Sequence, residues 1–108
     1  FKKESFDGIW ADAVLLHLER KDIPKVMKNF YYILRKGGII YVSVKYGKGA
    51  KFIKEKPFTN HLRFYTYFTK QEMENFFKEA GFKVINSGFL ADDLDRHNVK
   101  WISILAKK

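Results

Sequence analysis

A short apolar run that ends in a carboxylate constrains the fold of this chain more than any other stretch. Residues 6–11, Phe-Asp-Gly-Ile-Trp-Ala, predict a first strand, Asp12 follows directly, and a helix-like apolar segment covers residues 13–18. Such continuous apolarity favours a strand that helices cover on both faces of a sheet. Open α/β sheets bind ligands outside the carboxyl ends of their strands, so Asp12 is placed to meet a ligand amine or hydroxyl. It could equally cap the turn that follows.

A helix and a second strand come next, in an order that predicts a parallel pair. Residues 22–24, Asp-Ile-Pro, predict a helix start, with a capping acid and a proline in the first turn. Apolar side chains at helical spacing then define one buried face: Ile23, Val26, Met27, Phe30 and Leu34. Residues 36–38, Lys-Gly-Gly, should end this helix, with Gly37 left-handed. Residues 39–45 predict a fully buried strand, so the β-α-β unit should hold two parallel strands.

The second half of the chain predicts a loop, a helix and two strands. Residues 46–67 show no regular pattern and are expected to form a long basic and aromatic loop, often a lid or binding segment. A capping box over residues 69–72 begins a second helix that ends at Gly81. Residues 82–89 and 99–106 predict two strands with a short polar connection, hence an antiparallel pair. The expected fold is α/β, in the order β-α-β-loop-α-β-β.

The composition allows one folded domain over residues 1–108. Hydrophobic residues at 46% and aromatic residues at 18% are enough for a core. No apolar run approaches the roughly 18 residues that a membrane span needs. The chain has no cysteine, which fits a reducing cytoplasm. Because the first residue is Phe, we expect this to be a piece of a longer protein.

The charged and polar motifs leave alternatives open. Lys and Arg outnumber Asp and Glu by 21 to 12, for a net charge of +9. The segment from Lys45 to Tyr67 could therefore bind RNA, or it could be a solvated loop whose aromatic side chains cover the core. The histidines His17, His61 and His97 lack metal-ligand spacing, so no metal site is predicted. His17 either contacts a ligand or packs within its own helix.

In its motifs and their order, the chain resembles the C-terminal half of a class I S-adenosylmethionine-dependent methyltransferase. The resemblance rests on the strand and turn of residues 6–18, on Leu-Arg-Lys-Gly-Gly at 34–38, on Phe-Tyr-Thr-Tyr-Phe-Thr at 64–69, and on the closing strand pair. It covers essentially the whole chain. It implies a partial Rossmann-like sheet with the first strand at an edge, then the second, the last and the third. The family's glycine-rich cofactor loop and the acid that holds the cofactor ribose are absent from this sequence.

The resemblance also implies a set of binding residues. Those beside the methionine part of S-adenosylmethionine would be Ala11, Asp12 and Ala13, with His17 near the edge of the site. Those on the substrate side would be Tyr46, Arg63, Tyr65 and Tyr67. No catalytic residue is predicted, because a sulfonium is already activated and holding the nucleophile in line supplies much of the rate. The methyl acceptor stays open between a small molecule, a protein and tRNA.

Two further expectations concern the chain by itself. Without the glycine-rich loop it should bind the cofactor weakly and be inactive alone. Its first strand should present a bare, hydrophobic edge, which favours a homo-oligomer formed through that edge.

Overall fold

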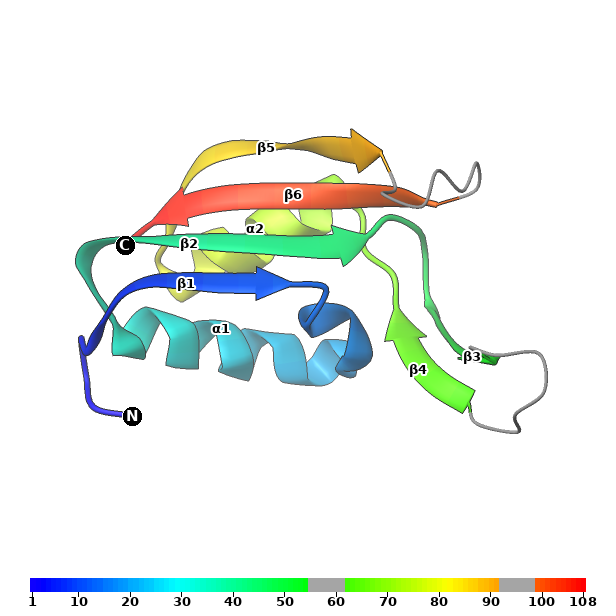
Figure 1. Cartoon of the computed structure of the whole chain (residues 1–108), viewed down its shortest axis with the longest axis horizontal. Coiled ribbons are helices and arrows are strands. Elements are labelled where there is room, and N and C mark those ends of the chain that lie inside the picture. Colours follow the sequence, from blue (N-terminus) through cyan, green and yellow to red (C-terminus); the bar gives the residue numbers. More distant parts are fainter. Residues whose placement is uncertain (55–61, 92–98) are drawn as a thin grey trace.

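The main body of the molecule is a four-stranded sheet. The computed structural model describes residues 1–54, 62–91 and 99–108. The sheet has the order β1-β2-β6-β5, formed by Phe6–Asp12, Leu34–Lys45, Lys100–Lys107 and Lys83–Ala91 (Figure 1). β1 and β2 are parallel, whereas β6 is antiparallel to both β2 and β5. The strand order, the parallel first pair and the antiparallel last pair are all as predicted.

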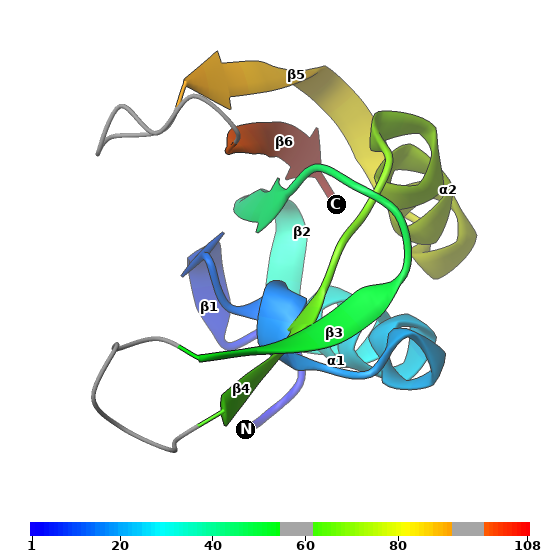
Figure 2. The same ribbon diagram turned by 90° about the vertical axis from the view of Figure 1, so that its right-hand side faces the viewer.

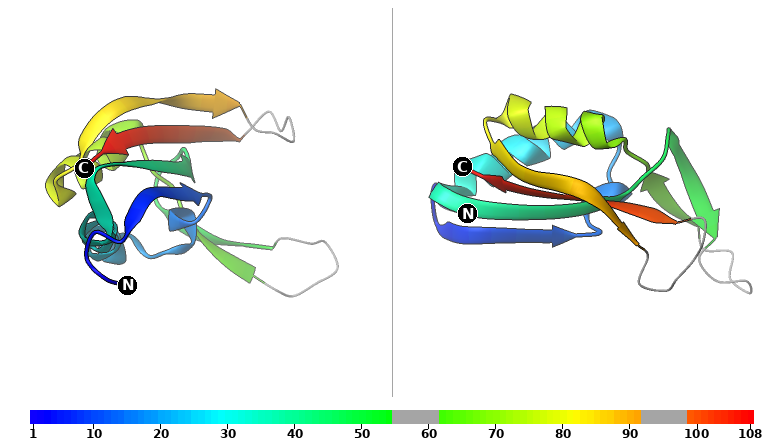
Figure 3. Two further views of the ribbon diagram at one scale, coloured as in Figure 1. Left: turned by 60° about the vertical axis from the view of Figure 1, so that its left-hand side comes forward. Right: turned by 90° about the horizontal axis from the view of Figure 1, so that it is seen from above.

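Both helices lie on the same face of this sheet. α1 spans Ile23–Ile33 and α2 spans Lys70–Ala80, and the view from above places the two helices together over the strands (Figure 3). Buried side chains of these helices, such as Met27 and Phe77, pack on alternate strand residues, such as Val42 and Ile104. This apolar layer between helices and sheet is the core of the molecule.

The opposite face of the sheet carries no helix from the described residues, which corrects the prediction that β1 and β2 are buried on both faces. Trp10 is 73% exposed and stacks on Tyr41 of β2, with 4.1 Å between ring centroids. Ile39 of β2 is also exposed. Alternation decides burial here, because successive strand residues point to opposite faces. Because the outer-face residues are themselves apolar, the sequence alone predicts strands that are buried on both faces.

The start of α1 lies where the sequence predicts it, but the end does not. The Asp22 side chain makes no capping hydrogen bond, although Pro24 occupies the first turn as expected. The helix stops before Leu34, which is fully buried and begins β2 opposite Phe6. Gly37 is left-handed, with φ of +79°, yet it lies inside β2 and does not end the helix. Because Leu34 is buried and pairs with Phe6 in the sheet, the helix ends before it reaches the glycines.

The caps of α2 lie at the predicted residues, Thr69 and Gly81, but of the predicted capping box only the Thr69 half is formed, because the Glu72 carboxylate binds Arg20. The Thr69 hydroxyl accepts a hydrogen bond from the backbone N–H of Glu72, at 3.2 Å. Gly81 follows the last turn with φ of +106°. The ring of Tyr31 approaches so closely that a Cβ atom at Gly81 would lie 3.1 Å from it.

A hairpin occupies much of the segment predicted to be an irregular loop. β3, Ala50–Lys54, pairs antiparallel with β4, Leu62–Thr66, and the two form a sheet of their own (Figure 2). Phe52 faces Phe64 across the pair at 5.2 Å between ring centroids. His61 and His97, which lack metal-ligand spacing and are expected at the surface, lie outside the described residues. Within the described part of the chain, no helix is long and apolar enough to cross a membrane.

Candidate functional site

The carboxyl ends of β1 and β2 meet at one edge of the sheet, and a hydrogen bond joins them there. Asp12 ends β1 and lies beside Ser43 of β2 in the parallel register. The Ser43 hydroxyl donates a hydrogen bond to Oδ1 of Asp12. Ser43 is 2% exposed, whereas Asp12 is exposed. A buried hydroxyl thus fixes an exposed carboxylate at the edge where α/β sheets bind ligands.

The backbone turns sharply directly after this carboxylate. Ala13 has φ of +57°, a left-handed conformation that costs a residue with a side chain on the order of 1–3 kcal/mol. Its N–H donates to both the backbone oxygen and the hydroxyl oxygen of Ser43, each at 3.1 Å. Ala11 is 4% exposed and its side chain packs into the core. Of the three residues predicted beside the cofactor, Asp12 presents its side chain to solvent.

His17 and Tyr65, predicted on different sides of a site, come together in the structure. Their ring centroids are 4.9 Å apart, and His17 Nδ1 lies 3.2 Å from the carbonyl oxygen of Phe64. Lys45 places its Nζ 4.4 Å from the Tyr65 ring centroid and 5.7 Å from that of Trp101. Four elements therefore meet here: the turn after β1, the end of β2, β4 and the start of β6.

Tyr46 belongs to a second aromatic cluster at the same edge of the sheet. Tyr46 is 45% exposed, and its ring meets Phe89 of β5 edge-on, with 5.4 Å between centroids. The Nζ of Lys100 lies 5.3 Å from the Phe89 ring and 5.9 Å from the Tyr46 ring. These contacts connect Tyr46 to β5 and β6, and they do not bring it against His17 or Tyr65.

The last two predicted substrate-side residues are Arg63, within β4 of the hairpin, and Tyr67, directly after it. Tyr67 packs against Gly47, where an added Cβ would lie 3.0 Å from the Tyr67 side chain, and Lys51 Nζ is 5.4 Å from its ring centroid. Burial raises the pKa of the Tyr67 phenol above its ordinary value. Arg63 has an exposed side chain on β4. The ligand-binding roles of all these residues stay predictions.

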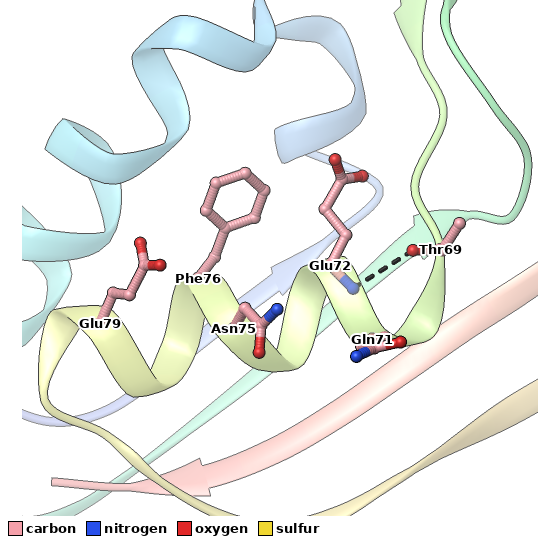
Figure 4. Close-up of a pocket in the computed structure, with 6 residues that line it drawn as sticks. All are labelled: Thr69, Gln71, Glu72, Asn75, Phe76 and Glu79. Atoms are coloured by element: carbon pink, nitrogen blue, oxygen red, sulfur yellow. Dashed lines mark hydrogen bonds between the residues drawn. The ribbon is translucent and has the colours of Figure 1, made fainter.

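A hollow lies away from this edge, along α2. It has a volume of about 430 Å³ and is lined by Thr69, Gln71, Glu72, Asn75, Phe76 and Glu79. In Figure 4, Glu72, Phe76 and Glu79 project from α2 towards α1. A smaller hollow of about 150 Å³ shares Phe76 and Glu79 and continues to Pro24 of α1. We place the candidate site at the strand ends, because this hollow is a wide, shallow surface lined largely by exposed polar side chains of a single helix.

Several residues that organise the strand-end edge were not predicted. Ser43 had a visible signal, because it is a polar residue between two valines in the apolar run of residues 39–44. Arg20 and Thr66 had none, because their partners lie 47 or more residues away in the sequence. Across the described ranges, no three His, Cys, Asp or Glu residues gather in a way that could hold a metal ion.

Comparison with known proteins identifies this fold. Residues 1–42 match a family model described as a methyltransferase domain. No curated protein sequence matches the chain. A solved S-adenosylmethionine-dependent methyltransferase from Methanosarcina mazei superposes with a TM-score of 0.82 at 17% identity, covering 100% of this chain and 61% of that one.

Two other solved structures share the fold. One is the 1,6-didemethyltoxoflavin-N1-methyltransferase of Burkholderia thailandensis, with S-adenosylhomocysteine bound, at a TM-score of 0.80 and 18% identity, covering 100% of this chain and 46% of that one. The other is the [4+2]-cyclase SpnF, at a TM-score of 0.68 and 15% identity, covering 100% and 51%. At such identities the likeness concerns the fold alone. The chain spans between about half and three-fifths of the length of these three structures.

Proposed function

We propose that this chain, whose fold is that of the C-terminal part of class I S-adenosylmethionine-dependent methyltransferases, supplies one wall of the cofactor site and the acceptor side of such an enzyme. The observation that carries the proposal is the match of residues 1–42 to the methyltransferase domain. Those residues include β1, the turn that bears Asp12, and all of α1. It is part of the proposal that this protein transfers a methyl group, that S-adenosylmethionine is its cofactor, and that it has a methyl acceptor.

The strand-end edge has the chemistry that such a cofactor requires. Asp12 offers an exposed carboxylate that can accept hydrogen bonds from an amine or a hydroxyl, and Ser43 fixes its position. The small side chain of Ala13 lets a ligand approach the backbone closely. S-adenosylmethionine would supply an activated methyl group, so the protein's task is to hold the acceptor in line with it. We propose that the wall around Tyr65 does so, a role that its contact with His17 of the cofactor-side turn supports.

The exposed edge of β1 supports the proposal that a further strand pairs with β1 in the complete enzyme. β1 pairs only with β2 among the described strands, and Trp10 beside that edge is 73% exposed. A bare apolar edge favours further pairing. We propose that a preceding part of the same enzyme covers this edge, and that the chain by itself forms homo-oligomers through it. Its site is then incomplete, so the isolated chain should bind the cofactor weakly and transfer no methyl group.

Neither the described structure nor the comparisons favour the RNA-binding alternative. Among the described aromatic residues of the segment from Lys45 to Tyr67, Tyr65 is 9% exposed, whereas Tyr46 and Phe52 are 45% and 65% exposed and their rings contact Phe89 and Phe64. The acceptor stays unidentified. The composition without cysteine is compatible with our proposal that the protein works in the cytoplasm.

A titration of the isotopically labelled chain with S-adenosylhomocysteine, followed by NMR, tests the proposed function. We expect weak, millimolar binding with amide shifts concentrated at residues 11–17. Asp12→Asn should weaken these shifts, whereas Asp7→Asn should not, because Asp7 is an exposed carboxylate at the other end of β1 that pairs with Arg35. Shifts that avoid the strand-end edge, or that Asp7→Asn alters as much as Asp12→Asn, would overturn the assignment.

A further inference from the structure

A continuous row of polar contacts joins the turn that follows β1 to the hairpin. We call the contacts between residues 17–20 and residues 64–67 the hairpin latch. Figure 2 shows β4 passing beside the short 3-10 turn Leu15–His17. Each member of the latch pairs a side chain on one segment with a backbone oxygen on the other. The two segments lie 47 or 48 residues apart in the sequence.

Three residues make these contacts in sequence order. His17 Nδ1 donates to the carbonyl oxygen of Phe64 at 3.2 Å. One step further along, the Thr66 hydroxyl donates to the carbonyl oxygen of Leu18. Arg20 Nη2 then donates to the carbonyl oxygen of Tyr67. Because the side chains alternate in origin between the two segments, neither segment can slide along the other without breaking several hydrogen bonds.

Arg20 extends the latch to a third element. Its Nε lies 2.9 Å from Glu72 Oε2 and its Nη2 lies 3.3 Å from Glu72 Oε1, near the start of α2. Its guanidinium carbon lies 5.3 Å from the centroid of the Phe68 ring, which is fully buried. A planar guanidinium can serve a carboxylate and a carbonyl at once, which an ammonium cannot do in the same geometry. Glu72 thus holds Arg20 in place. Its carboxylate is then not used in the capping box of α2, which keeps only the hydrogen bond to the Thr69 hydroxyl.

We propose that Arg20 is a positioning residue that holds the β3–β4 hairpin against the cofactor-side turn. Through Tyr67 and Thr66 it sets where Tyr65 stands relative to His17, and so relative to Asp12 five residues earlier. The hairpin that carries Tyr65 and the cofactor-side turn then move as one unit. Binding of a ligand at Asp12 therefore changes the environment of Tyr65. The part of this inference that concerns ligands rests on the proposed function, whereas the latch itself does not.

Amide hydrogen exchange of the whole chain without ligand tests the latch. Arg20→Gln should lower the protection of hairpin amides at residues 50–54 and 62–67 by about tenfold or more, because it removes charge-assisted hydrogen bonds. Protection in β2 and β6 should change far less. Arg35→Gln is the matched control, since it removes an arginine–carboxylate pair with Asp7 away from the hairpin. Arg20→Lys should restore only part of the protection.

A second variant distinguishes loss of the latch from a general loss of folding. Thr66→Val keeps the size of the side chain and removes only the hydroxyl that donates to Leu18, so the hairpin alone should again lose protection. If the hairpin amides of Arg20→Gln and Thr66→Val keep wild-type protection, or if every strand loses protection equally, the latch does not exist.

A titration with S-adenosylhomocysteine separates this inference from the proposed function. In the wild type we expect amide shifts at residues 11–17 together with shifts at Tyr65 and Tyr67. In Arg20→Gln the first set should remain and the second should vanish, which a purely structural role for Arg20 would not produce. Shifts that persist at Tyr65 and Tyr67 would refute the positioning role. If the ligand causes no shift anywhere, the proposed function fails, while hydrogen exchange still decides whether the latch exists.

Discussion

Replacing Ser43 by alanine should destabilise the chain through the loss of a carboxylate anchor and not through packing. Ser43 is 2% exposed, and its hydroxyl donates to Asp12 while accepting from the N–H of Ala13. A hydrogen bond to a charged group contributes about 1.5–3 kcal/mol. Water can take the place of the lost donor because Asp12 is exposed, and the Ala13 N–H keeps the backbone oxygen of Ser43. We therefore expect a loss of about 1–2 kcal/mol in the free energy of unfolding.

Equilibrium unfolding in urea measures this loss. The midpoint should fall by about 0.5–1 M with an unchanged slope, since the surface exposed on unfolding stays the same. Ser103→Ala is the matched control. Ser103 pairs directly with Ser43 across β2 and β6, and no described residue forms a side-chain hydrogen bond with its hydroxyl. Its replacement should cost less than about 0.5 kcal/mol.

A double-mutant cycle isolates the anchor itself. Combining Ser43→Ala with Asp12→Ala should reveal a coupling of about 1 kcal/mol, because the two side chains contact each other directly. If the effects simply add, or if Ser43→Ala and Ser103→Ala cost the same, then Ser43 does not hold Asp12 and the reasoning fails.

Four further changes test other parts of the structure. Thr69→Ala removes the hydroxyl that caps α2 and should cost about 1 kcal/mol in urea unfolding, whereas an unchanged midpoint would exclude the cap. Gly81→Ala should cost about 1–3 kcal/mol by the same assay, since φ is +106° and the new Cβ would meet the Tyr31 ring; a neutral result would contradict that geometry. Because the raised pKa of Tyr67 lets the folded state keep its proton after the unfolded state has lost it, stability should fall as pH rises above the ordinary tyrosine pKa. Tyr67→Phe should lessen that fall in alkaline unfolding curves, and curves of equal steepness would argue against it. Trp10→Ser should weaken self-association measured by light scattering, and a wild-type chain that is monomeric at every concentration would contradict pairing through β1.

Most of the fold could be predicted because its signals are local. The alternation of strand and helix patterns defines the parallel β1–β2 pair, and the short connection before β6 defines the antiparallel one. Thr69 and Gly81 mark the ends of α2 by chemistry that acts within a single turn. Where sheet pairing competed with local signals, the prediction was wrong. Leu34 has helical spacing, but its burial opposite Phe6 draws it into β2.

Two other features could not be predicted, for a related reason: the exposure of the outer face of the sheet and the pairing of the hairpin strands. Trp10 and Tyr41 are as apolar as core residues, and only the three-dimensional placement of the helices shows that nothing described covers them. β3 and β4 are each only five residues long, so their pairing is visible only once Phe52 is seen opposite Phe64.

The candidate site divides in the same way. Asp12 could be predicted because the end of a strand is a local feature with a general role in α/β sheets. The contacts of Arg20 could not, since they depend on segments brought together by the fold. Tyr46 and Tyr65 were both predicted on the substrate side, and that role stays a prediction; their rings contact different partners, Phe89 and His17, which depend on how the fold brings distant segments together.

Transferred nuclear Overhauser effects between the chain and S-adenosylhomocysteine test whether a ligand binds at the carboxyl end of β1, since weak binding suits this measurement. We expect contacts from the methionine part of the ligand to the Ala13 methyl group and to the Asp12 side chain. These contacts should be lost in Asp12→Asn and persist in Asp7→Asn. Contacts confined to Phe76 in the hollow along α2, or contacts that Asp12→Asn leaves unchanged, would contradict a ligand site at the carboxyl end of β1.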